Sequence, residues 1–312
     1  MGFFRESRIF LAIAIPVYII VKALFCLNIL SPYIQQICLY AIIVALTSLG
    51  LNVIYGYTGQ FSLGHAAFYG IGAYTSAYVT KLLCIESAIS FIPVLILCGI
   101  VSGFIGYLIG IPILRLRDDF LAIATLGFGT LVRVFLDNSD KFAESLGGSR
   151  GFVGIPRITN LELVFFSLIF VVLVTRNLIH SRYGLFWQCI KDDELAASSV
   201  GIDTASMKLM AFTYGCMLAG FGGALYANLY VFLHPSNFDL LRSIDFLIIV
   251  IIGGMGSIMG TIYASIIWIG FIEGLRIALP AHVLDLRWVV IPILLIALMM
   301  WRPYGLMIKK PR

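Results

Sequence analysis

The chain has 312 residues, of which 61% are hydrophobic and 12% are charged, with a formal net charge of +5 at pH 7. Soluble domains carry about 25% charged residues, so a water-soluble fold of this composition would lack the polar surface it needs. The composition therefore predicts a polytopic membrane protein, and its small, dispersed positive charge fits cytoplasmic loops better than a nucleic-acid surface.

Apolar runs of about 20 residues predict about ten membrane spans. Arg5 and Arg8 precede the first run, but no small-x-small cleavage site follows it, so we interpret it as an uncleaved span. The fifth and eighth runs are short and are candidates for half-spans. The predicted spans are residues 9–27, 33–55, 64–84, 88–113, 120–136, 161–179, 209–231, 241–255, 258–279 and 286–301.

The expected fold class is an all-α polytopic integral membrane protein, with about ten spans that include short or broken helices. Residues 1–312 form a single transmembrane domain in this interpretation. Lys and Arg collect on the cytoplasmic side of membrane proteins. An even number of spans places both termini there, including the basic block at residues 309–312. Reading 241–279 as one long span would put that block outside, so a break at 253–260 is favoured.

Two predicted spans carry a stripe of small residues along one helical face. Small residues let helix backbones approach closely inside a membrane. These stripes predict packing faces, and ordinary helix packing explains them at least as well as a pathway does. The stripes are Gly99, Gly103, Gly106 and Gly110 in one span, and Ala211, Gly215, Ala219 and Gly222 in the other.

The segment from Gly50 to Tyr78 is rich in glycine and carries no formal charge, and a second glycine-rich break covers residues 253–260. Irregular backbone at membrane depth is tolerated only where protein or a water-filled cavity covers it. We predict that the two breaks meet at the inner end of a path; the alternative is that both are only tight packing turns. The candidate path or gate residues are Gly59, Gln60, Ser62, Gly64, Gly253, Gly254 and Gly256, with Gln60 and Ser62 as the polar lining.

The connection at residues 180–208 is the most polar of those expected in the cytoplasm. Acidic residues at 192–194 precede a short alanine run and complement the N-terminus of a helix. Gly201 then fits the position just past a helix end. This pattern predicts a short helix from about Asp193 to Val200, bounded by flexible residues and available to a partner. The alternative is an ordinary surface loop. The segment 137–160, which we expect on the external side, is likewise either a surface for a partner or a loop that only connects spans.

The sequence contains no pattern for chemistry of its own. Cysteines and histidines are scattered without metal or redox spacing, so neither a metal nor a cofactor is expected. No phosphate-binding G-x-x-x-x-G-K-[ST] motif, H-E-x-x-H or G-x-S-x-G is present, which indicates neither an ATP site nor an enzyme. Acidic residues are nearly absent from mid-span positions, Glu273 being the main exception, and we expect it to pair with Arg276 one turn on. An ion-coupled pump is therefore poorly supported.

Several segments together resemble one family, the LivM-type permease subunits of bacterial ATP-binding-cassette importers for branched-chain amino acids. The most specific is Tyr57-Thr58-Gly59-Gln60-Phe61-Ser62-Leu63-Gly64-His65-Ala66. The other segments are Gly50 to Tyr74, Leu114 to Gly129, Gly147-Gly148 with Gly154-Ile155, Ser181 to Asp203, and Ile252 to Gly260. They follow one another in order through most of the chain.

The resemblance implies an all-helical permease that pairs with a second, LivH-like permease. Two cytoplasmic subunits would bind ATP and Mg, and an external binding protein would deliver leucine, isoleucine or valine across the inner membrane. The coupling segment of such importers has Glu-Ala-Ala, three residues, then Gly. Ala196, Ala197 and Gly201 fit that spacing, but Leu195 displaces Glu194 by one position, which leaves the role of Glu194 open. The candidate coupling residues are Arg182, Asp192, Asp193, Glu194, Ala196, Ala197, Gly201 and Asp203.

Three alternatives to this interpretation remain at this point. The cargo of an importer of this kind could be urea, an amide or another small amino acid, because the external binding protein would set selectivity. A stand-alone secondary carrier or channel would transport without partners, against which the lack of buried acids argues. A membrane enzyme would need polar residues clustered at one membrane depth, and the sequence indicates none.

Overall fold

The structure, a computed structural model, describes residues 16, 18, 19, 21–25, 27, 30–115, 118–141, 146–278, 300 and 305. Nearly all of this part of the chain is helical, which confirms the all-α polytopic fold class. The predicted span 286–301, most of 9–27 and the basic block at 309–312 lie outside the described residues. The main helices are α2 (Pro32–Leu51), α3 (His65–Leu82), α4 (Ala88–Ile113), α5 (Asp118–Asp137), α6 (Leu161–Ile179), α7 (Arg182–Asp192), α8 (Glu194–Ser199), α9 (Thr204–Tyr230), α10 (Leu240–Gly253) and α11 (Ile258–Ala278).

Six described helices are long and apolar enough to cross a membrane: α2 with its extension to Tyr57, α4, α5, α6, α9 and α11. Two further predicted spans correspond to α3, with 18 residues, and α10, with 14 residues. The described residues therefore support a polytopic bundle with six candidate spans and do not bear out a count of ten. The fifth predicted span is not short, because α5 extends over 20 residues.

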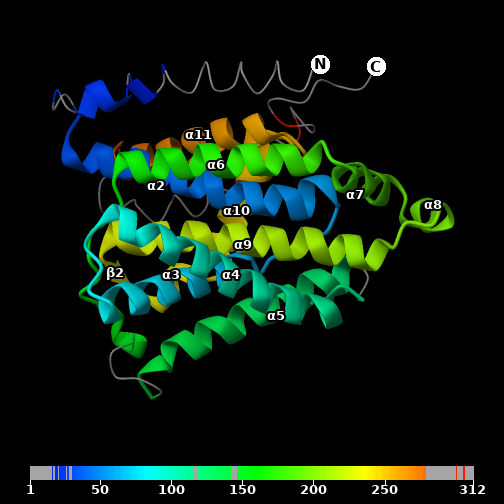
Figure 1. Ribbon diagram of the computed structural model, residues 1–312, viewed down its shortest axis with the longest axis horizontal. Helices are drawn as coiled ribbons and strands as arrows, with labels where there is room; N and C mark the ends of the chain where they lie inside the picture. Colours follow the sequence, from blue (N-terminus) through cyan, green and yellow to red (C-terminus); the bar gives the residue numbers. More distant parts are fainter. Residues whose placement is uncertain are drawn as a thin grey trace.

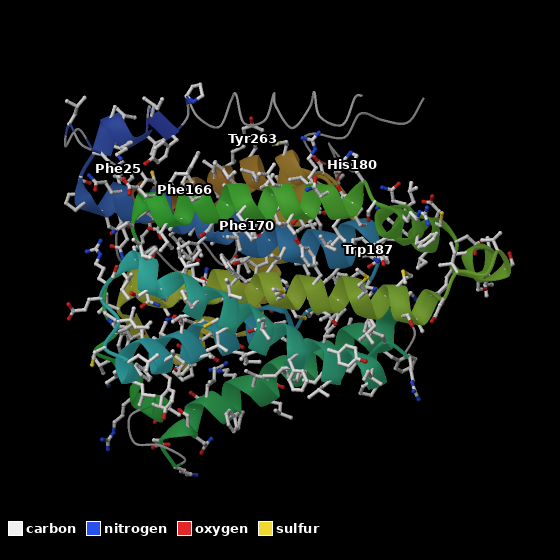
Figure 2. The ribbon with its side chains drawn as sticks, in the orientation of Figure 1. Phe25, Phe166, Phe170, His180, Trp187 and Tyr263 are labelled. Carbon is white, nitrogen blue, oxygen red and sulfur yellow. The ribbon has the colours of Figure 1, made fainter. Side chains whose placement is uncertain are left out.

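The helices run side by side along the long axis of the molecule, with α7 and α8 at one end and β2 at the other (Figure 1). We refer to the two ends of the bundle as the α7 end and the β2 end. Large apolar side chains cover the outside of the bundle; Phe166 and Phe170 on α6 are each 62% exposed, and Tyr263 on α11 is 49% exposed (Figure 2). Such a surface suits lipid better than water.

Helix α9 lies at the centre of the bundle and packs against α2, α3 and α4. The predicted stripe of α4 faces it: a Cβ on Gly103 would lie 3.3 Å from Met217 Cβ, and one on Gly106 would lie 2.7 Å from Cys216 Cβ. The predicted stripe of α9 faces α2, because a Cβ on Gly215 would lie 2.6 Å from Gly50 O. Both packing faces are thus confirmed.

Helices α3 and α10 both begin inside the bundle. The Nε2 atom of His65, the first residue of α3, lies 3.0 Å from the carbonyl oxygen of Thr47. Thr47 stands about 22 Å along α2 from Pro32 at 1.5 Å per residue, which is near the middle of the bundle. The next amide, Ala66 N, donates to Ser243 Oγ of α10 at 3.0 Å. The chain reaches these two helix starts from opposite ends, through residues 58–64 in one case and residues 231–239 in the other.

At the β2 end, the described residues of the segment 137–160 include short regular elements. It contains the short helices η2 (Ser139–Lys141) and η4 (Gly148–Arg150) and the strand β1 (Phe152–Val153). Strand β1 pairs antiparallel with β2 (Phe232–Leu233), with Phe152 opposite Leu233. The short helix η5 (Pro235–Phe238) then leads into α10.

A close contact between α3 and α9 supplies a test of this packing. A Cβ on Gly72 of α3 would lie 2.1 Å from Gly220 O of α9, whereas a Cβ on Gly270 of α11 meets no atom within 4 Å. Overpacking of this kind costs about 1–3 kcal/mol. We expect Gly72→Ala to lower the thermal unfolding midpoint of the purified chain and Gly270→Ala to leave it unchanged or raise it. Equal midpoints for the two variants would contradict the α3–α9 contact.

Candidate functional site

The glycine-rich segment after α2 leaves regular helix inside the bundle. Helix α2 continues as the π-helical segment η1 (Asn52–Tyr57), and Gly59 then adopts a φ of +75°, which favours glycine. Residues 59–64 run without helical structure back to the start of α3. Gln60 and Ser62 on this segment are 3% and 2% exposed, so the polar residues predicted to line a path are buried. Oε1 of Gln60 finds no hydrogen-bond donor within the described part of the chain.

The second break is a tight reversal between α10 and α11, which confirms that residues 241–279 are not one helix. Gly254 and Gly256 have φ values of +100° and +89°. A Cβ on Gly253 would lie 2.5 Å from the carbonyl carbon of Gly260, so the two helix ends touch through glycine. Gly254 and Gly256 therefore share a conformation that larger residues resist, and Gly253 lacks the space for a side chain.

The two breaks lie against one another, as the sequence predicted, and Asn52 joins them. Its Oδ1 accepts from Gly256 N at 2.9 Å. Its Nδ2 donates to Ser257 O at 3.1 Å and to Thr261 Oγ1 at 3.0 Å. Asn52 is 1% exposed, so these bonds form away from water. A single amide therefore satisfies groups on the turn between α10 and α11 from the end of α2.

The predicted coupling segment is helical over most of its length. We expected a short helix bounded by flexible residues. Instead, the longer helix α7 precedes the short helix. Trp187 anchors α7, since its side chain is fully buried and its Nε1 donates to Met207 O at 3.0 Å. The short helix itself is confirmed as α8. Asp193 caps it, accepting from Leu195 N at 2.8 Å and Ala196 N at 3.0 Å through Oδ1.

Helix α8 ends as the sequence predicted, at Gly201. This glycine has a φ of +86° and donates to Ser198 O at 3.0 Å, while Ile202 N donates to Ala197 O at 3.2 Å. The two bonds make a Schellman motif, which fixes the helix end. Helix α8 projects at the end of the molecule (Figure 1), with Leu195 82% exposed and Val200 75% exposed. A rigid helix with exposed apolar side chains suits docking to a partner.

The remaining coupling candidates divide between structural and exposed positions. Ala197, a residue of α8, is buried, whereas Arg182, Asp192 and Ala196 are exposed. Asp203 caps α9, and hydrogen bonds from Ser206 hold the pKa of its carboxyl below the usual range.

Glu194, whose role its displaced position left open, forms an ion pair with α9. Its Oε2 lies 2.6 Å from Lys208 Nζ on α9.

Two lysines connect the coupling segment to the first break. Lys191 Nζ donates to Gly56 O at 2.6 Å, and a Cβ on Gly59 would lie 3.5 Å from Lys191 Cγ. The backbone of Lys208 also takes part, because Gln60 Nε2 donates to its carbonyl oxygen at 3.1 Å. Burial lowers the pKa of the Lys191 ammonium, and the adjacent Asp192 carboxylate opposes that shift.

Apolar packing reinforces this connection at the α7 end. A cluster of buried side chains joins η1 to α7 and α9; its members are Val53, Tyr57, Ile179, Trp187 and Ala211. The two candidate groups predicted separately from the sequence, the coupling segment and the glycine-rich breaks, are thus one connected structure.

Sequence reasoning missed several of the connecting residues. Asn52 carried a usable signal, since an amide within an apolar run must find partners. Lys191, Lys208 and Trp187 carried none, because polar and aromatic residues are ordinary in a cytoplasmic segment. Two acids inside the bundle were also overlooked, Asp239 and Asp245.

Both of these acids pair with arginine. Arg133 Nη1 lies 2.6 Å from Asp239 Oδ2, and Arg242 Nη1 lies 3.5 Å from Asp245 Oδ2. The expected pair of Glu273 with Arg276 is present at 3.6 Å. Within the described residues, no group of three or more His, Cys, Asp or Glu side chains is arranged to hold a metal.

Comparison with known proteins gives a consistent match. Residues 33–299 match the family described as branched-chain amino acid transport system / permease component. The chain is 34% identical over 306 residues to the high-affinity branched-chain amino acid transport system permease protein LivM of Salmonella typhimurium, covering 87% of this chain and 69% of that protein. LivM of Escherichia coli K12 is 33% identical over the same shares. LivH of Salmonella typhimurium is 23% identical over 253 residues, covering 75% of this chain and 82% of LivH. No solved structure matches the chain.

The bridge between the two breaks is open to direct test. Replacing Asn52 with alanine leaves Gly256 N and Thr261 without the amide partner and opens space in a buried site. Each buried polar group left unsatisfied costs about 1–3 kcal/mol of stability. We expect Asn52→Ala to lower the thermal unfolding midpoint clearly. Asn138→Ala is the control, because the amide of Asn138 bonds only to nearby groups at the exposed end of α5. A midpoint for Asn52→Ala that matches the control would contradict the bridge.

Proposed function

Because the chain belongs to the permease family of branched-chain amino acid transport systems, we propose that it is one of two permease subunits of an ATP-driven importer. The cargo in this proposal is leucine, isoleucine or valine, moved across the bacterial cytoplasmic membrane. A LivH-like permease completes the path, two cytoplasmic subunits bind ATP and Mg, and an external protein delivers the solute. The proposal includes about ten crossings, which place both termini in the cytoplasm.

The observation that carries the proposal is the connection between α7–α8 and the two breaks. A protein that receives force from a partner needs a rigid surface for docking and a stiff link from that surface to the part that moves. Helix α8 supplies the surface, since Asp193 caps its start and Gly201 fixes its end. The link runs through Lys191 to Gly56 and through Lys208 to Gln60.

The mechanism follows from these contacts. Closure of the ATP-binding subunits presses on α8 and, through α7, on the π-helical end of α2. Residues 59–64 move with it, because Gln60 is hydrogen-bonded to the start of α9. The turn between α10 and α11 moves too, since Asn52 holds it. The path thereby opens alternately to the two sides of the membrane.

Charge reversal on α8 tests the coupling. In the assembled complex in proteoliposomes, we expect Asp193→Lys combined with Glu194→Lys to reduce ATP-dependent leucine uptake by at least about tenfold, because the helix cap and the pair with Lys208 are both lost. Glu86→Lys, on an exposed residue between α3 and α4, is the control. Normal uptake by a normally assembled double variant would refute the coupling role.

The same preparation separates the alternatives. Uptake by vesicles that contain this chain alone, driven by an ion gradient, would indicate a secondary carrier. Uptake of urea or an amide by the full complex, without uptake of leucine, would keep the importer and change its cargo.

The gate role of the breaks makes a separate prediction. Leucine in place of Gly59 or Gly254 must adopt a φ of +75° or +100°, which side chains resist. We expect each variant to abolish uptake, while Gly270→Leu, at a position with no atom within 4 Å of a Cβ, retains it. Full uptake by both Gly59→Leu and Gly254→Leu would mean that the breaks are packing turns only.

A further inference from the structure

The pair formed by Arg133 and Asp239 lies deep in the bundle yet remains partly exposed. Asp239 directly precedes α10, whose 14 residues extend about 21 Å to Gly253 at the α7 end. That distance is shorter than the hydrocarbon core of a membrane, which is about 30 Å thick. The side chain of Arg133 is 37% exposed and that of Asp239 is 30% exposed. Charged side chains at such a depth face a water-filled cavity or another protein rather than lipid.

The geometry of the pair leaves each partner with spare binding capacity. Arg133 Nη1 lies 2.6 Å from Asp239 Oδ2, and Arg133 Nε lies 3.9 Å from Asp137 Oδ2 on the same helix. Asp239 Oδ1 accepts from Leu240 N at 2.7 Å. A guanidinium has five N–H donors and a carboxylate has about four acceptor positions, so both can bind further groups.

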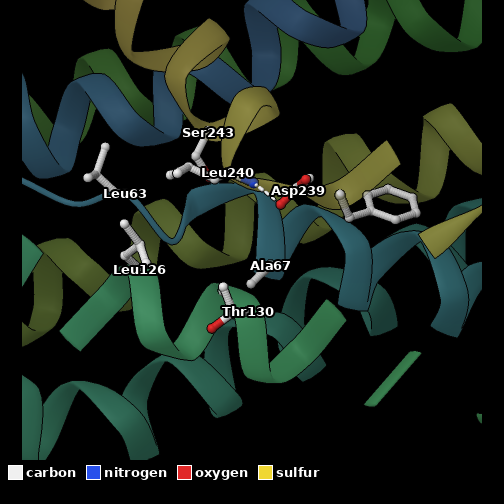
Figure 3. A pocket seen from close by; sticks show the side chains of 9 residues that line it. Leu63, Ala67, Leu126, Thr130, Asp239, Leu240 and Ser243 are labelled. Atoms are coloured by element: carbon white, nitrogen blue, oxygen red, sulfur yellow. Dashed lines mark hydrogen bonds between the residues drawn. The ribbon is translucent and has the colours of Figure 1, made fainter. Parts of the chain in front are cut away.

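A small cavity lies beside the pair, between α5, the start of α3 and the start of α10. Figure 3 shows Leu126 and Thr130 of α5 across from Leu240 and Ser243 of α10. Leu63 and Ala67 also line it. Its volume of about 10 Å³ holds roughly one water molecule. The lining is apolar next to Leu63 and Leu126 and becomes charged at Asp239.

One wall of this cavity is the least covered of the candidate spans. Of the residues in the apolar stretch of α5, 22% are buried, a smaller share than in any other candidate span. It contacts the glycine-rich segment closely where Leu63 N donates to Thr125 Oγ1 at 3.1 Å and a Cβ on Gly64 would lie 2.5 Å from Thr125 O. The coupling segment contacts residues 59–64, so these residues link it to the wall of the cavity.

We propose that α5 moves during transport to widen this cavity, and that Arg133 and Asp239 then form a transient binding site for the charged groups of an amino-acid zwitterion whose aliphatic side chain enters the cavity. The Arg133 guanidinium binds the carboxylate of the solute, and the Asp239 carboxylate binds its ammonium. Each protein charge thereby changes its partner from the other protein residue to the solute, and neither is left unpaired. Leu63, Ala67 and Leu126 contact the aliphatic part. This assignment rests on the proposed function, since it needs an amino acid as cargo.

The test removes both charges together. Arg133→Gln with Asp239→Asn keeps the size of each side chain, leaves no unpaired charge, and retains a residue that caps α10. In the assembled complex we expect stability and ATP hydrolysis to persist while the maximal rate of leucine uptake falls by at least about tenfold. Glu273→Gln with Arg276→Gln neutralises another arginine–carboxylate pair, on α11, and should change uptake by less than about twofold.

Each result decides the assignment. Uptake by the Arg133/Asp239 double variant within about twofold of the wild type would show that the pair is dispensable for the solute. Failure of this variant to assemble would give the pair a structural role and would equally overturn the proposal. A wild-type complex that does not take up leucine with ATP would refute the proposed function itself, and the zwitterion site with it.

Discussion

The side chain of Asn52 holds together the two irregular segments around which the bundle is built. A buried amide without partners costs roughly 2–7 kcal/mol, so it is tolerated only where donors and acceptors are placed for it. Here its oxygen and nitrogen are both satisfied by the turn between α10 and α11. Neither the end of α2 nor that turn can move independently while these bonds persist. The breaks consequently act as one unit.

That unit is continuous with α7 and α8 through polar and apolar contacts. Lys191 reaches the carbonyl of Gly56 that the π-helical geometry leaves available, and Gln60 reaches the carbonyl of Lys208 near the start of α9. Trp187 and Tyr57 fill the space between. Because α8 is capped at both ends, little of a force applied to it would be lost in deforming the helix. In the proposed mechanism, coupling follows from contact between neighbouring segments and requires no long-range pathway.

Ion pairs account for the acidic side chains inside the bundle. Few acids of the described residues occur inside the bundle, and Asp239 and Asp245 are each joined to an arginine. Arg242 also donates to the hydroxyl of Tyr40 and lies over its ring, within a cluster of buried tyrosines. The pair at Arg133 differs because it borders a cavity and the least buried helix. Its position suits a solute that carries both charges.

The sequence by itself determined the fold class, most helix boundaries and the two groups of functional candidates. Composition and apolar runs are sufficient for this because lipid permits few structures other than helices. The spacing of acids, alanines and Gly201 determined α8, since capping is local chemistry. Only the tertiary structure decided that α3 and α10 start inside the bundle, that Lys191 and Gln60 connect the coupling segment to the breaks, and that Arg133 meets Asp239. These contacts join residues far apart in the chain, and no local pattern specifies which buried polar group will meet which.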